Sequence, residues 1–400
     1  SLMAIPKIKI NYLNGQLGTV PESQDGLLAL VVGATAVSSS FGLNTPYTIY
    51  RSAGLSALGI TSENNARLYE LVLQFYDEAD EGTPLVIVGT DPAKKMTELC
   101  DKASGPLATV IQTMKGELRG LILARNPEEE EEVEATEGLD PDVFTALPKA
   151  QELAEWATVT LYAPLFVALE GRSFSGAASL KDLSKERYNR CCILIGDLVT
   201  GSEGAAMGTF AGRVAVAPVQ RNIGRVRDGA LAPAVMYLGT KKVEDAIDDI
   251  TAIYDKGYIT PRTYVGKAGY YFTDDRLCCE ETDDYAHLTG RRTIDKAYRI
   301  AYATLLNYML DEIAVNTDGT MQTGILKSWQ ATVEDAIDAQ MTAAGELSAD
   351  TGGGGSGAQC YIDPSQNVVA TSQIELTLKV RPFGYAREII VNLGFLMEAA

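Results

Sequence analysis

Histidine is the side chain best suited to proton transfer near neutral pH, and this chain of 400 residues contains only one, His287, in the stretch YAHLTGRR. A single histidine cannot build a multi-histidine metal site, and it nearly excludes a histidine-based catalytic triad. We interpret His287 as a surface histidine, or as one whose hydrogen bonds are satisfied locally.

Two glycine-rich stretches have the composition of loops that hold phosphate at a helix N-terminus. They are VVGATA at residues 31–36 and GSEGAAMGTFAG at residues 201–212. Neither matches GxGxxG or GxxxxGK[ST], and Asp197 with Glu203 has no recognised metal-ligand spacing. Ordinary turns explain both stretches, but they keep one alternative function open, that of a nucleotide- or sugar-phosphate-handling α/β enzyme.

Acidic residues gather at three places in the sequence. Asp274 with Asp275, and Asp283 with Asp284, are adjacent pairs that we interpret as solvated loop charges. The run from Glu128 to Glu132, continued by Glu134 and Glu137, predicts a solvated loop, with cation binding as the alternative. We therefore expect no catalytic residue, no cofactor and no metal ligand in this chain.

Composition limits the compartment and the partners. The six cysteines include two adjacent pairs, Cys191/Cys192 and Cys278/Cys279, and none has CxxC spacing, which favours reduced thiols in a cytosolic protein. The net charge of −19 disfavours nucleic acid and anionic membranes as partners. No apolar run approaches the ~20 residues of a membrane helix, and the first thirty residues do not resemble a signal peptide. The partners that we expect are proteins.

Basic residues form two clusters in this acidic chain. Arg213, Arg221, Arg225 and Arg227 lie within GRVAVAPVQRNIGRVRDG. Arg291 and Arg292 open a predicted helix that Asp311 and Glu312 close, the reverse of the charge order that the helix dipole favours. One hypothesis is that Arg225, Arg227, Arg291 and Arg292 pair with acidic surface on another copy of the chain. The alternative is that they are indifferent surface charges.

The region from Leu27 to about Ala217 predicts an α/β fold. Continuous apolar runs, typical of buried strands, alternate with amphipathic helical patterns, which indicates mixed sheets flanked by helices. The predicted strands are LLALVV, LVIV, LRGLILA, LFVALE, CCILIG and RVAVA. The predicted helices are ENNARLYELVLQFYDEA, the segments near residues 96–101 and 150–162, and VEDAIDDITAIYDKGYI.

The last third of the chain predicts two helices followed by two strands. Apolar residues recur at helical spacing in residues 291–313 and 325–341. TYVGKAGYYFTDD, upstream, predicts a strand, a turn and a strand, and the GGGGSG of residues 352–357 is interpreted as a flexible connector. Residues 373–381 alternate apolar and polar side chains, which indicates a half-buried strand, and residues 387–395 predict a second strand.

Both ends of the chain have the pattern of extended arms. At the N-terminal end Lys7, Ile8 and Ile10 belong to a short alternating stretch; at the other end Ile389, Val391 and Leu393 would set the register of a strand. Terminal strands of this kind can add to the edge of another molecule's sheet. We expect an N-terminal arm (1–24), an α/β domain (25–255), an α+β C-terminal domain (256–385) and a C-terminal arm (386–400).

In the order of its predicted elements and in their patterns of helix and strand, the C-terminal third resembles the tail sheath proteins of contractile phages and contractile injection systems. It looks closest to their short, Mu-like branch. The resemblance rests on RTYVGKAGYYFTDD, on GRRTIDKAYRIAYATLLNYMLDEI and on IELTLKVRPFGYAREIIVNLGF, and it covers about the last 140 residues. It implies a structural protein without enzymatic activity, with the C-terminal domain facing an inner tube and the α/β domain outside.

The resemblance further implies sixfold rings stacked in a helical polymer, linked by the two arms and able to contract. The implied partners are other copies of the chain, a tail tube protein, and baseplate and terminator proteins, without nucleic acid binding or membrane insertion. The implied location is a virion tail, with assembly in the host cytoplasm. A contractile sheath subunit is therefore the expected function; besides the enzyme, an adaptor module that binds a partner without polymerising remains open.

Overall fold

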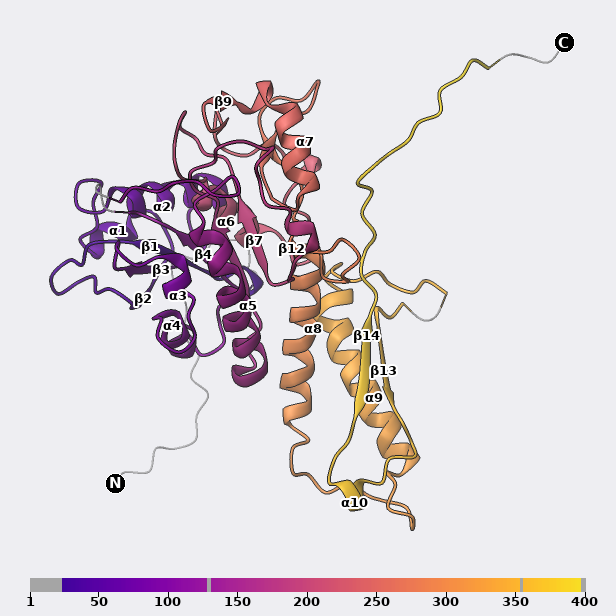
Figure 1. Cartoon of the computed structure of the whole chain (residues 1–400). Coiled ribbons are helices and arrows are strands. Elements are labelled where there is room, and N and C mark those ends of the chain that lie inside the picture. Colours follow the sequence, from indigo (N-terminus) through magenta and orange to yellow (C-terminus); the bar gives the residue numbers. More distant parts are fainter. Residues whose placement is uncertain (1–23, 128–130, 353–354, 397–400) are drawn as a thin grey trace.

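The structure is a computed structural model that describes residues 24–127, 131–352 and 355–396. The predicted N-terminal arm, with Lys7, Ile8 and Ile10, lies outside these residues. A sheet-containing body forms most of the molecule, and a long helix carries the chain from this body into a narrow projection (Figure 1).

A six-stranded sheet forms the centre of the body, with strand order β2-β3-β1-β4-β5-β7. Neighbouring strands are parallel except at the edge, where β2 runs antiparallel to β3. The strands are β1 (Leu28–Gly33), β2 (Pro46–Ile49), β3 (Leu85–Thr90), β4 (Gly120–Ala124), β5 (Phe166–Glu170) and β7 (Cys191–Leu194). All residues of β1, β3, β4, β5 and β7 are buried, as expected for continuous apolar strands covered on both faces.

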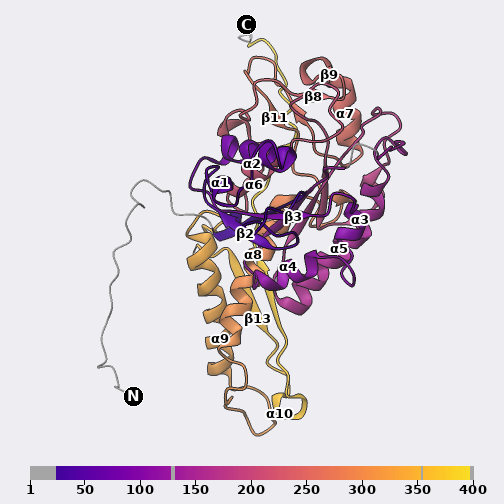
Figure 2. The same cartoon turned by 90° about the vertical axis from the view of Figure 1, so that its left-hand side faces the viewer.

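Helices cover both faces of this sheet. The pair α2 and α6 packs on one face, while α4 and α5 lie on the other (Figure 2). The helices of this part are α1 (Gly54–Ala57), α2 (Ala66–Ala79), α3 (Met96–Leu99), α4 (Leu107–Thr113), α5 (Asp142–Leu161) and α6 (Met207–Val216). The prediction of a mixed α/β sheet flanked by helices is confirmed.

One predicted strand of the body is wrong. The stretch RVAVA, residues 213–217, belongs almost entirely to helix α6. Two glycines allow this helix to lie against α2: a Cβ on Gly208 would come within 2.1 Å of the Leu71 carbonyl oxygen, and one on Gly212 within 2.7 Å of the Phe75 carbonyl oxygen. Close helix packing therefore overrode the β propensity of the valines.

Short elements precede β7 or follow α6, and several of them contribute to the same core. They are β6 (Arg187–Tyr188), β8 (Tyr237–Leu238), β9 (Lys241–Lys242), α7 (Ile247–Asp255), β10 (Pro261–Arg262), β11 (Tyr271–Phe272) and β12 (Cys278–Cys279). Of the strand-turn-strand predicted for TYVGKAGYYFTDD, the second strand corresponds to β11. Its antiparallel partner β10 lies just before this stretch, and the predicted first strand, from Thr263, does not form. The largest hydrophobic cluster extends from Leu28 to Leu288. The domain boundary after residue 255 stays a prediction.

The projection consists of two helices and a hairpin, with α8 and α9 side by side (Figure 1). Its elements are α8 (Leu288–Leu306), α9 (Thr323–Ile337), a π-helical turn (Asp338–Thr342), β13 (Ala358–Ile362), α10 (Val368–Thr371) and β14 (Leu376–Val380). The two predicted helices and the first predicted terminal strand are present, and β14 alternates half-buried and exposed residues as expected. The sequence pattern missed β13, its antiparallel partner.

The second predicted terminal strand does not form within the subunit. Residues 387–395 have no assigned strand and no ladder with any part of the chain that the structure describes. Among the helices of the described residues, none has the length and apolar character needed to cross a membrane.

Candidate functional site

The carboxyl ends of the parallel strands, where open α/β folds bind ligands, hold a network of ion pairs. Glu170, the last residue of β5, is fully buried and accepts hydrogen bonds from Arg67 at 2.5 Å and from the backbone N–H groups of Arg125 at 2.7 Å and Ala205 at 3.0 Å. Burial acts to raise the pKa of Glu170, but the charges of Arg67 and Arg172 outweigh it and hold the pKa below its usual value.

Packing explains the glycine-rich stretches in this region. A Cβ on Gly204 would lie 2.6 Å from Nη2 of Arg67, so a glycine here leaves room for the buried ion pair. The loop after β1 is fixed by Asn65, whose side chain accepts from Thr35 N–H at 2.7 Å and donates to the Thr35 carbonyl at 3.0 Å. The nucleotide-handling alternative has no support from these contacts.

Residues 128–130 of the acidic run lie outside the described residues, and the rest of the run is only partly solvated. Glu131 forms a two-pronged ion pair with the buried guanidinium of Arg125, at 2.8 and 2.7 Å, so the prediction of a solvated charge is wrong for this residue. Glu132, Glu134 and Glu137 are exposed as expected. All six cysteines are free and buried.

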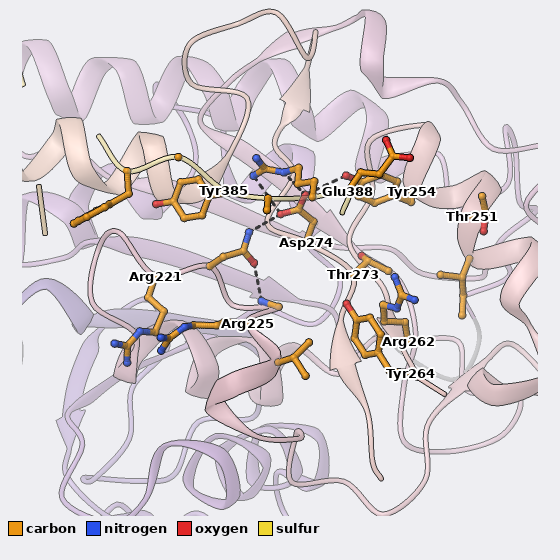
Figure 3. Close-up of a pocket in the computed structure, with 18 of the residues that line it drawn as sticks. Arg221, Arg225, Thr251, Tyr254, Arg262, Tyr264, Thr273, Asp274, Tyr385 and Glu388 are labelled. Carbon is orange, nitrogen blue, oxygen red and sulfur yellow. Dashed lines mark hydrogen bonds and ion pairs between the residues drawn. The ribbon is translucent and has the colours of Figure 1, made fainter. Parts of the chain in front are cut away.

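Asp274 and Asp275 are buried, so the interpretation as solvated loop charges is wrong for this pair. Both follow β11, and Asp274 lines a groove of about 1110 Å³ (Figure 3). Asn222 donates to both carboxylates, at 2.6 and 3.1 Å, and Tyr254 donates to Asp274 at 3.1 Å. His287 Nδ1 lies 2.9 Å from Asp275, which satisfies the lone histidine as expected.

The chain's own C-terminal segment crosses this groove and supplies a cation to it. Arg387 Nε donates to Asp274 at 2.7 Å, and its Nη2 lies 3.7 Å from Asp275. Tyr385, two residues earlier and labelled in Figure 3, donates to the Gln220 carbonyl at 2.5 Å. Ligand atoms of Asp274, Asp275 and His287 lie within 4.8 Å of one another, a spacing that could hold a metal ion, and the Arg387 guanidinium provides the positive charge here.

The pKa values of the two carboxylates are shifted in opposite directions. Burial acts to raise the pKa of Asp274, but the hydrogen bonds from Arg387 and the charge of His287 outweigh it, so the pKa lies well below its usual value. The pKa of Asp275 is raised by burial and by the neighbouring charge of Asp274, against the hydrogen bond to His287. Asp274 is thus the carboxylate that holds the C-terminal segment.

Beyond this anchor the C-terminal segment leaves the body (Figure 1). Its apolar side chains are exposed. Ile389, Val391 and Leu393 are 79%, 76% and 93% exposed, and Phe395 is 99% exposed. No part of the chain that the structure describes buries these side chains. We refer to residues 388–396 as the free tail.

The four arginines predicted to pair between copies fall into two environments. Arg291 and Arg292 are buried at the start of α8: Arg291 lies against Tyr285 and 3.5 Å from Asp295, and Arg292 donates to the carbonyls of Asp25 and Ala217. Arg225 is half-buried and pairs with Asp228 at 2.6 Å, whereas Arg227 is exposed. Pairing with another copy through these residues stays a prediction.

Sequence reasoning did not identify the anchor. Adjacent aspartates after a strand-like run, and an arginine preceding an apolar stretch, are each common on protein surfaces. The one available indication was that Asp274, Asp275, His287 and Arg387 all lie in or beside the segments that resemble sheath proteins.

Solved structures with the same fold were found along nearly the whole chain. A chain of the anti-feeding prophage (AFP) baseplate matches with a TM-score of 0.62 and 14% identity, covering 99% of this chain and 100% of that chain. The AFP helical sheath in its contracted state matches with a TM-score of 0.61 and 12% identity, covering 98% of this chain and 99% of that chain. The contracted sheath complex of PVC, an extracellular contractile injection system, gives 0.59 and 13%, covering 98% of each chain.

The fold is therefore that of the sheath proteins of contractile injection systems. The chain belongs to the DUF2586 family, whose N-terminal domain model matches residues 5–276 and whose C-terminal domain model matches residues 284–400. No curated protein matches the sequence.

Proposed function

We propose that this chain is the structural subunit of a contractile tail sheath, which polymerises around an inner tube and contracts to drive the tube into a target cell. The observation that carries the proposal is the free tail: an extended apolar segment, anchored at Arg387 and unpaired with any described part of its own subunit, on a chain with a sheath fold. Such a segment is stabilised by adding to the sheet edge of a neighbour.

The finer assignment follows the sequence expectation. Residues 25–255 form the outer α/β domain and residues 256–385 the inner α+β domain, with arms at residues 1–24 and 386–400. Copies of the chain form sixfold rings stacked in a helix, with a tube protein inside and with baseplate and terminator proteins at the ends. The subunit acts as a building block without enzymatic activity, on a virion tail that is assembled in the host cytoplasm.

Contraction needs a source of free energy within the polymer. Ion pairs occupy the carboxyl ends of the sheet, where a nucleotide would bind. We propose that two packings of the same subunit, which differ in their contacts between copies, supply the energy difference. Arms that stay paired in both packings keep the copies connected during the change.

Removal of either arm tests the proposal. A chain without residues 3–12, or one ending at Arg387, should remain folded by circular dichroism but fail to form tubes under conditions in which the full chain forms them with its tube protein. Negative-stain electron microscopy gives the result. Tubes formed by both truncated chains would contradict the assignment, and a ligand that stabilises the soluble monomer specifically would favour the enzyme alternative.

A further inference from the structure

A second cleft lies where the first described residues, the start of β4 and helix α8 meet. Its volume is about 660 Å³, and Asp25, Arg119, Lys296, Arg299 and Glu346 line it. The side chain of Arg292 is buried beside it, against the Asp25 carbonyl. No part of the proposed arm pairing uses these residues.

Positive charge exceeds negative charge in this cleft. Lys296 pairs with Asp25 at 2.6 Å and with Glu346 at 2.7 Å, and Arg299 pairs with the other oxygen of Asp25 at 2.5 Å. These contacts use both carboxylates. Within the part of the chain that the structure describes, Arg119 and Arg292 have no carboxylate within 4 Å.

The two unpaired guanidiniums are held by backbone groups only. Arg292 donates to the carbonyls of Asp25 and Ala217, at 3.3 and 3.0 Å, and Arg119 donates from Nη1 to the Gly116 carbonyl. The Nε of Arg119 is buried without a hydrogen-bond partner. A guanidinium stays charged at any physiological pH. Among the described residues, the positive charges of Arg119, which lines the cleft, and of Arg292, buried beside it, therefore have no counter-ion, and one donor of Arg119 has no acceptor.

The arrangement costs the subunit stability. Burial, followed by the charge of Arg299, lowers the pKa of Arg119 to about 10. Burial also lowers the pKa of Arg292 to about 10, with Arg299 acting in the same direction against Asp25. A charge that is buried or half-buried without a counter-ion is destabilising, and a bound ligand of opposite charge relieves that cost.

We propose that this cleft binds one oxyanion, and that in the assembled sheath the oxyanion is a carboxylate side chain from a second copy of the chain. The second part rests on the proposed function. Each copy carries 53 acidic against 34 basic residues, so a neighbouring copy presents carboxylates in excess to a cationic cleft. Inorganic phosphate has the same chemistry and serves as the probe for the isolated subunit.

Thermal unfolding of the full chain tests the site itself. Sodium phosphate, compared with sodium chloride at equal ionic strength, should raise the melting temperature by about 2–4 °C at saturating concentration. Arg119→Gln should raise the melting temperature without phosphate, because like-charge repulsion is relieved, and should abolish most of the phosphate response. Arg119→Lys, which keeps the charge, and Arg227→Gln, at an exposed site, should respond like the unchanged chain. Equal phosphate responses in all four proteins would overturn the oxyanion site.

Sedimentation velocity and electron microscopy test the source of the oxyanion. If a neighbour's carboxylate fills the cleft, Arg119→Gln should lower the extent of assembly at least tenfold relative to Arg227→Gln, and phosphate should compete with assembly of the unchanged chain. If Arg119→Gln assembles normally but has lost its phosphate response, the cleft binds a free anion. That result would overturn the proposal that a neighbouring copy's carboxylate fills it. Failure of the unchanged chain to assemble would count against the sheath function and leave the phosphate result to decide the site.

Discussion

At the scale of single residues, the Arg387–Asp274 contact is the last one that holds the C-terminal segment on the body before the free tail begins. It is a charge-assisted hydrogen bond of 2.7 Å between a half-buried arginine and a buried carboxylate. Such bonds contribute about 1–3 kcal/mol, and partial solvent exposure of Arg387 reduces this to the lower end. The contact is strong enough to orient the segment and weak enough to release it.

Arg387→Ala should free residues 383–387 from the groove because Tyr385 alone then holds them. We expect backbone hydrogen exchange of this stretch to speed up about tenfold or less, with a loss of global stability below about 1 kcal/mol. Lys379→Ala, on the exposed face of β14, is the matched control and should leave exchange unchanged. Equal protection of residues 383–387 in both variants would show that the contact does not anchor the segment.

The same contact predicts a dependence on pH. The folded-state pKa of Asp274 lies below its ordinary value of 3.8, so the unfolded chain takes up the proton first as the pH falls. The stabilisation by this group is therefore complete above about pH 4 and is lost at lower pH. Asp274→Asn should remove this part of the acid destabilisation, measured by denaturant unfolding between pH 3 and 6. An unchanged slope against pH in the variant would contradict the assignment.

At the scale of elements, helical and strand periodicity were sufficient for the five parallel strands of the central sheet, for α2 and for both helices of the projection, but not for the edge strand β2. These segments have one dominant pattern, as Leu28–Gly33 and Ala66–Ala79 illustrate. Sequence periodicity failed where contact with a residue far away in the sequence determines the secondary structure. RVAVA became helical because glycines let it pack on α2, and β13 formed because β14 lies beside it. The buried Asp274–Asp275 pair was missed for the same reason.

The close approach of α2 and α6 gives a test at this scale. Gly208→Ala would put a Cβ against the Leu71 carbonyl and force the helices apart, which we expect to cost about 1–3 kcal/mol in the free energy of unfolding. Gly324→Ala, in α9, meets open space and should change stability by less than about 1 kcal/mol. Urea denaturation separates the two. Equal stability of both variants would mean that the helix pair does not depend on glycine.

At the scale of the whole molecule, the body and the projection are tied together by buried charges as well as by apolar contact. Arg190 in the body pairs with Asp295 of α8 at 2.9 Å, and Asp25 binds both Lys296 and Arg299. Separation of the body from the projection would break these ion pairs and leave buried charges without a partner. Because an unpaired buried charge is costly, the pairs oppose that separation. In the proposed sheath, the subunit therefore moves as one unit and the arms provide the adjustable connection between copies.

The anchor at Arg387 also sets a length. Nine residues, 388–396, follow it in the described chain, and fully extended they reach roughly 30 Å. In the proposed sheath, these nine residues alone let two copies joined through the free tail separate by up to about that distance while they stay connected. The length of this short peptide thus contributes to the distance that a ring of the proposed sheath can travel in a single stroke.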